Sequence, residues 1–397
     1  MKNNLIDLIE KYGEPDALID HWSKDNTGYA IWGFKDTILW KNSKDIKTDK
    51  EISELLASIQ KTIDEWKKND SEISAIGFIN YNFKDILYKH ISFKNTNSTF
   101  PYLFFGQPKL IKKYTIECNV SISTRMELKK DFENFEKYKN KIQRIKSELK
   151  QGNVYQINYT NNKSYTIKSS PLELYLYLRN KAKPKYGYYI KYSNMNILSF
   201  SPELFFKTEK NIIYTSPMKG TRKRSNNIEQ DNQLKFELKN SIKDRAEHLM
   251  IVDLLRNDLG KIALPGTIRV NDIFKIESHP TVHQMVSNIQ GEIDDSIKVI
   301  DILKGLFPGG SITGAPKESA MTIIDKLENY SRDLYTGSIG YIKSNGNLNF
   351  NISIRTMTIK NNKGIYPIGG GIVWDSNALD EWNEAHLKSE ILNLVTK

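Results

Sequence analysis

Cysteine and long hydrophobic segments are almost missing from this chain of 397 residues. Its only cysteine is Cys118, so neither an internal disulfide nor a cysteine-rich zinc site can form. The longest apolar runs, such as Leu249–Val252, are far shorter than the ~20 residues that a membrane-spanning helix needs. No apolar segment follows the charged N-terminus, so a secretory signal is not expected. These absences predict a cytoplasmic protein that does not enter a membrane.

The glycine-rich signatures of common cofactor and hydrolase sites are also missing. Neither the GxGxxG pattern of dinucleotide-binding folds nor the GxSxG turn of many hydrolases occurs. The segment PGGSITGAPK (308–317) has the glycines of a phosphate loop, but Ala315 and Pro316 separate Gly314 from Lys317. Because it fails the Walker pattern, a nucleotide phosphate site is not predicted there.

Positive charge, in contrast, is present in excess. The chain has 58 Lys and Arg against 47 Asp and Glu, which gives a formal net charge of +11. This balance favours anionic partners without identifying them. The basic residues are scattered rather than gathered in one block, so nucleic-acid binding is not expected as the main function.

Hydrophobic periodicity predicts strands in adjacent groups, with helices between the groups. Such grouping favours an α+β fold with mainly antiparallel sheets and helices packed outside them. Helices are expected at 49–68, 128–151, 228–258, from Pro316 onward and over the C-terminal segment 378–395; strands at 27–34, 74–83, 154–162, 186–192, 197–208, 211–217, 266–276 and 283–290; and a loop at 92–102.

Two of the expected helices carry carboxylates at helical spacing. Asp244 and Glu247 are three residues apart in KDRAEHLMIVDL, and Glu381 and Glu384 are three apart in LDEWNEAHLKSE, with Lys388 one turn further on. Residues at this spacing lie on one face of a helix. If the two faces converge, their oxygens are suitable ligands for Mg²⁺. The alternative is an ordinary solvated charged face on each helix.

A lysine and a glycine run are further candidates. Lys219 lies in SPMKGTRKR between a strand and a polar loop, where it is either a surface lysine or, if desolvated, a nucleophile. The run Gly369, Gly370 and Gly371 is either a turn or a place where the backbone approaches an anionic ligand.

Taken together, these segments resemble the chorismate-utilising enzymes, which include anthranilate synthase component I, aminodeoxychorismate synthase component I, isochorismate synthases and salicylate synthases. The resemblance implies two facing antiparallel sheets with helices outside and a site in a cleft between the halves. It also implies one integrated domain, with 1–120 as an abbreviated N-terminal portion and 121–397 as the catalytic region. The matching stretches run in family order from about 125 to 392: GNVYQINYT, SPELFF, SPMKGTRKR, DRAEHLMIVDLLRNDLG, VHQMVSNIQGE, FPGGSITGAPK, LYTGSIGY, NISIRTM, PIGGGIVWDS and EWNEAHLKSE.

The resemblance assigns a role to each matching position. Glu247 and Glu384 would hold Mg²⁺, with Asp244 and Glu381 acting through metal-bound water. Glu203 would be the acid that helps the C4 hydroxyl of chorismate to leave. His283, near the ring, would be a further catalytic residue. The remaining matches would be substrate contacts: Arg355 and Tyr335 at the enolpyruvyl carboxylate, Thr313, Gly370, Gly371 and Lys388 around the ring carboxylate, and Gln156.

Two positions distinguish the members of the family. Gln156 stands where isochorismate and salicylate synthases have a water-activating lysine, and an amide cannot act as that base. Ammonia therefore becomes the expected nucleophile. Lys219 stands in PMKGT, where aminodeoxychorismate synthases typically have PIKGT and anthranilate synthases PIAGT. The resemblance thus implies the aminodeoxychorismate synthase reaction. The alternatives are anthranilate synthase component I, isochorismate synthase and a basic binding protein without catalysis.

The partners follow from the same resemblance. Cys118 lies in TIECNVS and not in a glycine-flanked elbow, so the chain has no glutaminase nucleophile of its own. A separate glutamine amidotransferase subunit is the implied source of ammonia, and chorismate is the implied substrate.

Overall fold

The computed structural model describes residues 4–22, 26–41, 48–69, 71–94, 98, 100–117, 124–279 and 282–396. Cys118 lies outside these residues, and the expected loop at 92–102 lies only partly within them. None of the described helices is long and apolar enough to cross a membrane.

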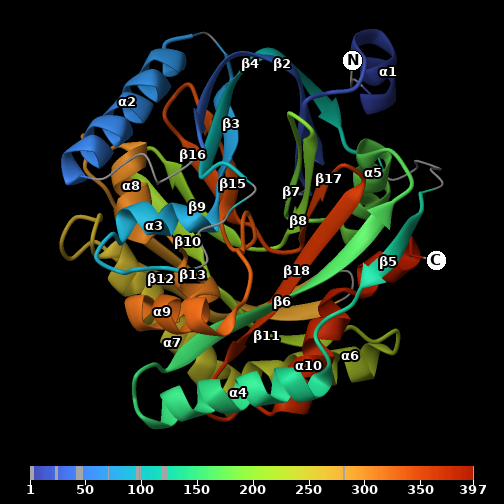
Figure 1. Ribbon diagram of the computed structural model, residues 1–397, viewed down its shortest axis with the longest axis vertical. Coiled ribbons are helices and arrows are strands. Elements are labelled where there is room, and N and C mark those ends of the chain that lie inside the picture. The colour runs from blue at the N-terminus through green and yellow to red at the C-terminus, as the bar shows by residue number, and fades with distance from the viewer. Residues whose placement is uncertain are drawn as a thin grey trace.

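The strands form one continuous ribbon in which every pairing is antiparallel (Figure 1). The hydrogen-bonded order from one end to the other is β5 (Met126–Lys130), β6 (Gln156–Ile167), β18 (Lys363–Ile372), β17 (Thr356–Lys360), β8 (Met195–Ser201), β7 (Tyr186–Tyr192), β1 (Ala17–His21), β2 (Thr27–Trp40), β4 (Leu103–Thr115), β3 (Ile73–Ile79), β15 (Ser338–Lys343), β16 (Leu348–Ile352), β9 (Leu204–Glu209), β10 (Ile212–Ser216) and β13 (Val282–Glu292). Two more strands, β11 (Met218–Lys223) and β12 (Arg269–Ser278), pair with β13 at the far end, and a short strand, β14 (Gly314–Ala315), adds to β6. The N-terminal strands β1 to β4 thus lie in the middle of the ribbon.

The two halves of the ribbon face each other across a shared core. Successive residues of a strand point to opposite faces, and burial follows this period. On β1, Leu18 joins an outer cluster while its neighbour Ile19 joins an inner one. On β3, Ile79 belongs to the opposite outer cluster and Phe78 to the inner one. Strands from both halves therefore contribute to one inner layer, which confirms the expected fold of facing sheets.

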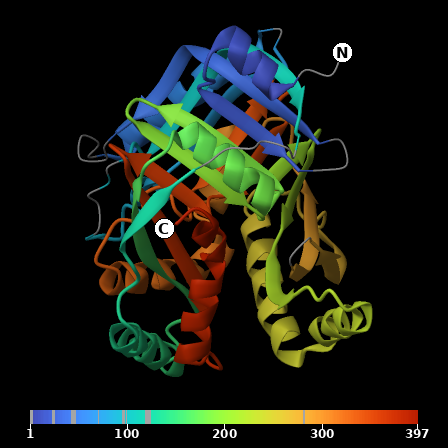
Figure 2. The ribbon, with the colours of Figure 1, turned by 90° about the vertical axis from the view of Figure 1, so that its right-hand side faces the viewer.

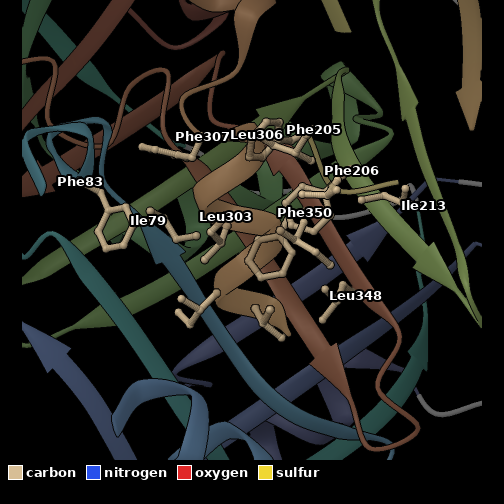
Figure 3. Close-up of a cluster of buried hydrophobic side chains, with 14 of the residues drawn as sticks. Ile79, Phe83, Phe205, Phe206, Ile213, Leu303, Leu306, Phe307, Leu348 and Phe350 are labelled. Carbon is tan, nitrogen blue, oxygen red and sulfur yellow. The ribbon is translucent and has the colours of Figure 1, made fainter. Parts of the chain in front are cut away.

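Helices cover the outer faces. On one half lie α1 (Leu5–Tyr12) and α5 (Pro171–Ala182). On the other lie α2 (Asp49–Lys67), the short α3 (Lys84–Leu87) and α8 (Val299–Leu306). Leu303 and Leu306 of α8 belong to the cluster drawn in Figure 3. The rest of the helices surround the ends of β6, β18 and β11: α4 (Phe135–Lys150), α6 (Ile228–Asn240), α7 (Ile242–Leu259), α9 (Lys317–Leu327) and α10 (Ala378–Lys388).

Three helix boundaries differ from the expectation. The helix expected at 128–151 begins only at Phe135, because 126–130 pairs with β6 as strand β5. The helical block 228–258 is two helices, and Ser241 separates them because its hydroxyl accepts the Asp244 N–H at 3.2 Å and caps α7. The C-terminal helix ends at Lys388 and continues as a 3₁₀ turn.

Candidate active site

Lys219 lies at an irregularity of the β11–β13 ladder. The register shifts between Lys219 and Thr221, and Gly220 between them has a φ of 72°. Glycine adopts this left-handed conformation without strain, and such bulges redirect the neighbouring side chain. The Lys219 side chain reaches toward β18, where a β-carbon placed on Gly371 would lie only 2.6 Å from its Nζ atom. Two strands from different parts of the ribbon thus meet at this amine.

Gln156 lies beside the same glycine. Its side chain is fully buried, and a β-carbon on Gly371 would be 3.1 Å from its Cδ atom. Neither its amide nitrogen nor its amide oxygen has a hydrogen-bond partner among the residues that the structure describes. A buried amide without partners costs free energy, so this side chain is suited to a polar ligand that would lie next to Gly371.

Glu203 is a buried carboxyl group near the lysines of the site. Its Oε1 atom accepts a hydrogen bond from the Ser311 hydroxyl at 2.8 Å. Burial raises the pKa of Glu203 to about 7, although Ser311, Lys219 and Lys388 act in the opposite direction. A carboxyl group with such a pKa can be protonated near neutral pH, which is what a general acid requires.

The paired carboxylates occur on α7 and α10, as expected from their spacing. Figure 2 shows these two helices on either side of the lower end of the molecule, α7 in yellow and α10 in red. Burial raises the pKa of Glu247, and the charges of Asp244 and Glu384 add to this effect. Because Glu384 belongs to the other helix, the two carboxylates lie within electrostatic range of each other.

Each of the four carboxylates has a partner within the protein. Asp244 binds Arg222 at 2.8 Å, and Glu381 accepts from Ser376 at 2.7 Å. The remaining two pair with lysines, Glu247 with Lys243 at 3.9 Å and Glu384 with Lys388 at 2.7 Å.

The donor set fits Mg²⁺. No three metal-ligating side chains surround a single point within the described part of the chain. However, Mg²⁺ is usually bound by one or two carboxylates and keeps several waters. Glu247 and Glu384 supply two carboxylates from different helices. Burial, together with the charges of Asp244 and Glu384, raises the pKa of Glu247, and a bound cation would oppose these effects.

Lys388 and Arg355 differ in how they are paired. Lys388 donates to the carbonyl of Gly369 at 2.9 Å as well as to Glu384. Arg355 has a φ of 50° and forms no ion pair with any carboxylate in the described residues. Its positive charge counteracts the effect of burial on the pKa of Tyr366 on β18, so the two side chains lie within electrostatic range of each other. An anion could therefore bind Arg355 without displacing a partner.

Three other expected site residues are buried. Tyr335 is almost fully buried, and burial raises its pKa. The Thr313 hydroxyl donates to the carbonyl of Gly309 at 2.8 Å, so this proton is not available to a ligand. His283 has both ring nitrogens engaged, with Ser278 at 2.9 Å and Asp231 at 3.0 Å. The structure thus places His283 in a side-chain network and leaves neither ring nitrogen open to a substrate.

Sequence reasoning missed two polar side chains of this site. Ser311 lies two residues before Thr313, and only the folded chain shows that it binds Glu203. His248 directly follows Glu247 and is buried, with Nε2 at 2.7 Å from the Ser287 hydroxyl. Burial, aided by the charge of Lys219, lowers the pKa of His248 to about 4. Its position next to a candidate metal ligand was the only signal in the sequence.

A profile of the family described as chorismate binding enzyme matches residues 121–393. Anthranilate synthase component 1 of Saccharolobus solfataricus is 36% identical over 80% of this chain and 79% of its own length. Aminodeoxychorismate synthase component 1 is 40% identical in Salmonella typhimurium and 39% in Escherichia coli, over 62% and 66% of this chain. These two matches span 54% and 58% of the relatives' own lengths.

Solved structures show the same fold. Anthranilate synthase component I from Streptococcus pneumoniae matches with a TM-score of 0.78 at 22% identity, over 93% of this chain and 92% of that protein. The menaquinone-specific isochorismate synthase from Escherichia coli matches with a TM-score of 0.75 at 14% identity, over 96% of this chain and 88% of that protein.

Proposed function

The chain belongs to the chorismate binding enzyme family, and from this premise we propose that it converts chorismate and ammonia to 4-amino-4-deoxychorismate through a covalent bond to Lys219. The observation on which the proposal depends most is the position of the Lys219 amine, next to Gly371 and within electrostatic range of Glu203. Gln156 occupies the neighbouring position with an amide, which cannot deprotonate water. Ammonia addition is therefore favoured over water addition.

The reaction has two substitutions. The Lys219 amine forms a bond to C2 of chorismate, the two ring double bonds shift, and the C4–O bond breaks. Glu203 donates its proton to the departing hydroxyl, which leaves as water. Ammonia then forms a bond to C4, the double bonds shift back, and the C2–N bond to Lys219 breaks as the amine recovers its electron pair. Covalent catalysis of this kind divides one difficult substitution into two easier ones.

The other candidate residues bind the substrate. Arg355, which has no carboxylate partner in the described residues, would bind the enolpyruvyl carboxylate with Tyr335 beside it. The ring carboxylate would lie near Gly370, Gly371, Thr313 and Lys388. Glu247 and Glu384 would hold Mg²⁺, with Asp244 and Glu381 behind them, and the bound ion would neutralise the ring carboxylate. His283, enclosed by Ser278 and Asp231, supports the strand rather than the reaction.

Ammonia would come from a second protein. Relatives of this chain are named component 1 of their enzymes, and a glutamine amidotransferase subunit is the partner that fits this reaction.

Anthranilate synthesis is the second candidate. Anthranilate synthases match this chain at similar identity, and the archaeal one matches over the greater share of both chains. In that reaction ammonia itself would attack C2. Lys219, whose amine lies next to Gly371, favours the first candidate.

Product identification distinguishes the two. Purified protein is incubated with chorismate, Mg²⁺ and ammonium, and the products are separated and weighed by mass spectrometry. We expect 4-amino-4-deoxychorismate, which retains the pyruvyl group. Anthranilate, which has lost it, or isochorismate as the main product would overturn the proposal.

A further inference from the structure

A buried arginine outside the expected set lies directly behind the site. Arg332 and Glu328 are almost fully buried and form an ion pair, with Nη2 at 2.7 Å from Oε1 and Nε at 2.8 Å from Oε2. An arginine side chain has five N–H donors in a fixed plane. Two of these donors bind the Glu328 carboxylate, and the other three also have acceptors.

The three remaining donors bind three different segments. Nη2 donates to the carbonyl of Asn158 on β6 at 2.6 Å. Nη1 donates to the carbonyl of Ile312 at 3.0 Å and to the Thr336 hydroxyl at 3.4 Å. Glu328 adds a further contact to β6, because its Oε1 atom accepts from the Thr160 N–H at 3.0 Å and the Thr160 hydroxyl at 2.7 Å.

Each bound segment carries a residue of the candidate site. Asn158 pairs with Gly371 across the β6–β18 ladder and lies two residues after Gln156. Ile312 follows Ser311, the donor to Glu203. Thr336 follows Tyr335 and has a φ of 62°, a conformation that few residues other than glycine adopt without support.

We propose that Arg332, held by Glu328, is a positioning residue that fixes the Gly371 strand, the Ser311 loop and the Tyr335 turn relative to one another. This inference rests on the proposed function, because those segments are the ones that would face chorismate. A buried ion pair is a poor source of net stability. Its value here is geometric, since the planar fork satisfies five acceptors at once and an ammonium group cannot.

Tyr81, on a 3₁₀ turn (Tyr81–Phe83) of the N-terminal portion, packs against the guanidinium group of Arg332. The Arg332 guanidinium carbon is 4.9 Å from the centre of the Tyr81 ring. The ring thus limits movement of the guanidinium away from its acceptors, and the N-terminal portion contributes to the arrangement of the site.

The test compares Arg332→Lys with Arg179→Lys. Arg179 is an equally buried arginine that pairs with Asp20 at 3.1 Å between β1 and α5, away from the candidate site. Both substitutions keep the charge and remove the fork. For Arg332→Lys we expect kcat with chorismate and ammonium to fall about a hundredfold, since misplacement by about 1 Å can cost that much. For Arg179→Lys we expect kcat to stay within about twofold, with a comparable loss of thermal stability.

A pH profile separates positioning from mere loss of folded protein. The Ser311 hydrogen bond lowers the pKa of Glu203, so a loosened Ser311 loop moves the descending limb of the kcat profile to higher pH. The limb should move in Arg332→Lys and stay in Arg179→Lys. Equal kcat losses in the two variants, or an unmoved limb in Arg332→Lys, would refute the proposal.

If Arg332→Lys does not fold, Thr336→Val removes the hydroxyl that accepts from Arg332 at 3.4 Å and donates to the Tyr335 carbonyl at 2.5 Å. A several-fold increase of KM for chorismate is expected there, and an unchanged KM contradicts the proposal. All assays follow chorismate consumption, so they remain informative if the product proves to be anthranilate. In that case the proposed product is wrong, while the positioning role is still tested.

Discussion

The Nζ atom of Lys219 occupies the space that a side chain at Gly371 would need. A β-carbon on Gly371 would lie 2.6 Å from that atom, closer than any carbon and nitrogen pack without bonding. The glycine is therefore required by the lysine, and the two residues come from strands that the ribbon keeps apart. A substitution of Gly371 therefore tests whether activity requires the Lys219 amine at this position.

Gly371→Ala should displace the amine without unfolding the protein. The clash is with the flexible end of a lysine and with Gln156, whose Cδ would be 3.1 Å away, so we expect a stability change of about 1 kcal/mol or less. Activity should fall about a hundredfold. Gly364→Ala, on the same strand but against Ile167 and Met357, is the matched control and should keep its kcat. Normal turnover by Gly371→Ala would show that the amine need not occupy this position.

Lys219→Ala should remove the nucleophile. Formation of 4-amino-4-deoxychorismate should fall by at least about a thousandfold, as is typical when a covalent catalyst is deleted. Any residual amination should shift to C2, because only ammonia is then left to attack. Liquid chromatography with mass detection measures both products, and Lys239→Ala on the exposed side of α6 serves as control. Unchanged turnover in Lys219→Ala would exclude a covalent role.

The rate should fall as the pH rises through about 7. Glu203 must be protonated to donate to the leaving hydroxyl, and burial raises its pKa to about 7. The descending limb of the kcat profile should therefore lie near that pH, and Glu203→Gln should lose both the limb and most of the rate. A descending limb that persists in Glu203→Gln would assign it to another group.

The same group makes a prediction about stability. Its pKa is higher in the folded chain than the ordinary 4.5, so the stabilisation from its bound proton is complete below about 4.5 and is lost as the pH rises through about 7. The change that Glu203→Gln makes in the free energy of unfolding should therefore be more favourable at pH 8 than at pH 4. The difference between the two changes should be up to roughly 3 kcal/mol. Urea titrations at the two pH values measure this difference, and equal effects at both would contradict it.

Local spacing alone identified only the paired carboxylates, and the other site residues were predicted from the family resemblance. Asp244 with Glu247 and Glu381 with Glu384 recur at helical intervals, and the fold follows from apolar periodicity along the strands. Glu328 and Arg332 also have a helical interval, which would suggest an exposed pair. However, Glu328 directly follows the last residue of α9 and has an extended backbone, and both side chains are buried against β6. Only long-range packing gives that pair its position.

The hydrogen-bond partners of the site residues could not be predicted from the sequence either. His283 is in a family motif, yet its two nitrogens bind Ser278 and Asp231, the latter 52 residues away in sequence. Likewise, the Ser311 hydroxyl meets Glu203 across 108 residues. No local pattern encodes such contacts, because they depend on how the ribbon folds back on itself.

Mg²⁺ should stabilise the protein in the absence of substrate. Binding between Glu247 and Glu384 would relieve their repulsion, and a ligand at a hundred times its Kd adds about 2.7 kcal/mol to the free energy of unfolding. The melting temperature should rise with Mg²⁺ in the wild type but not in Glu384→Gln. Glu390→Gln, which removes an exposed carboxylate that pairs with Lys223 at 4.0 Å, should respond as the wild type does. No Mg²⁺ response in the wild type would count against the site.

Gln156→Met should stabilise the free protein and weaken substrate binding. The buried amide of Gln156 has no partner in the described residues, so a thioether of similar shape should raise the free energy of unfolding by about 1 kcal/mol. If chorismate supplies the missing partners, KM should increase by roughly tenfold because that hydrogen bond is lost. Chemical denaturation and steady-state kinetics measure the two effects, and Gln151→Met on the exposed end of α4 is the control. A stabilised variant with unchanged KM would mean that the amide faces no substrate atom, and a destabilised one that it has a partner in the free protein.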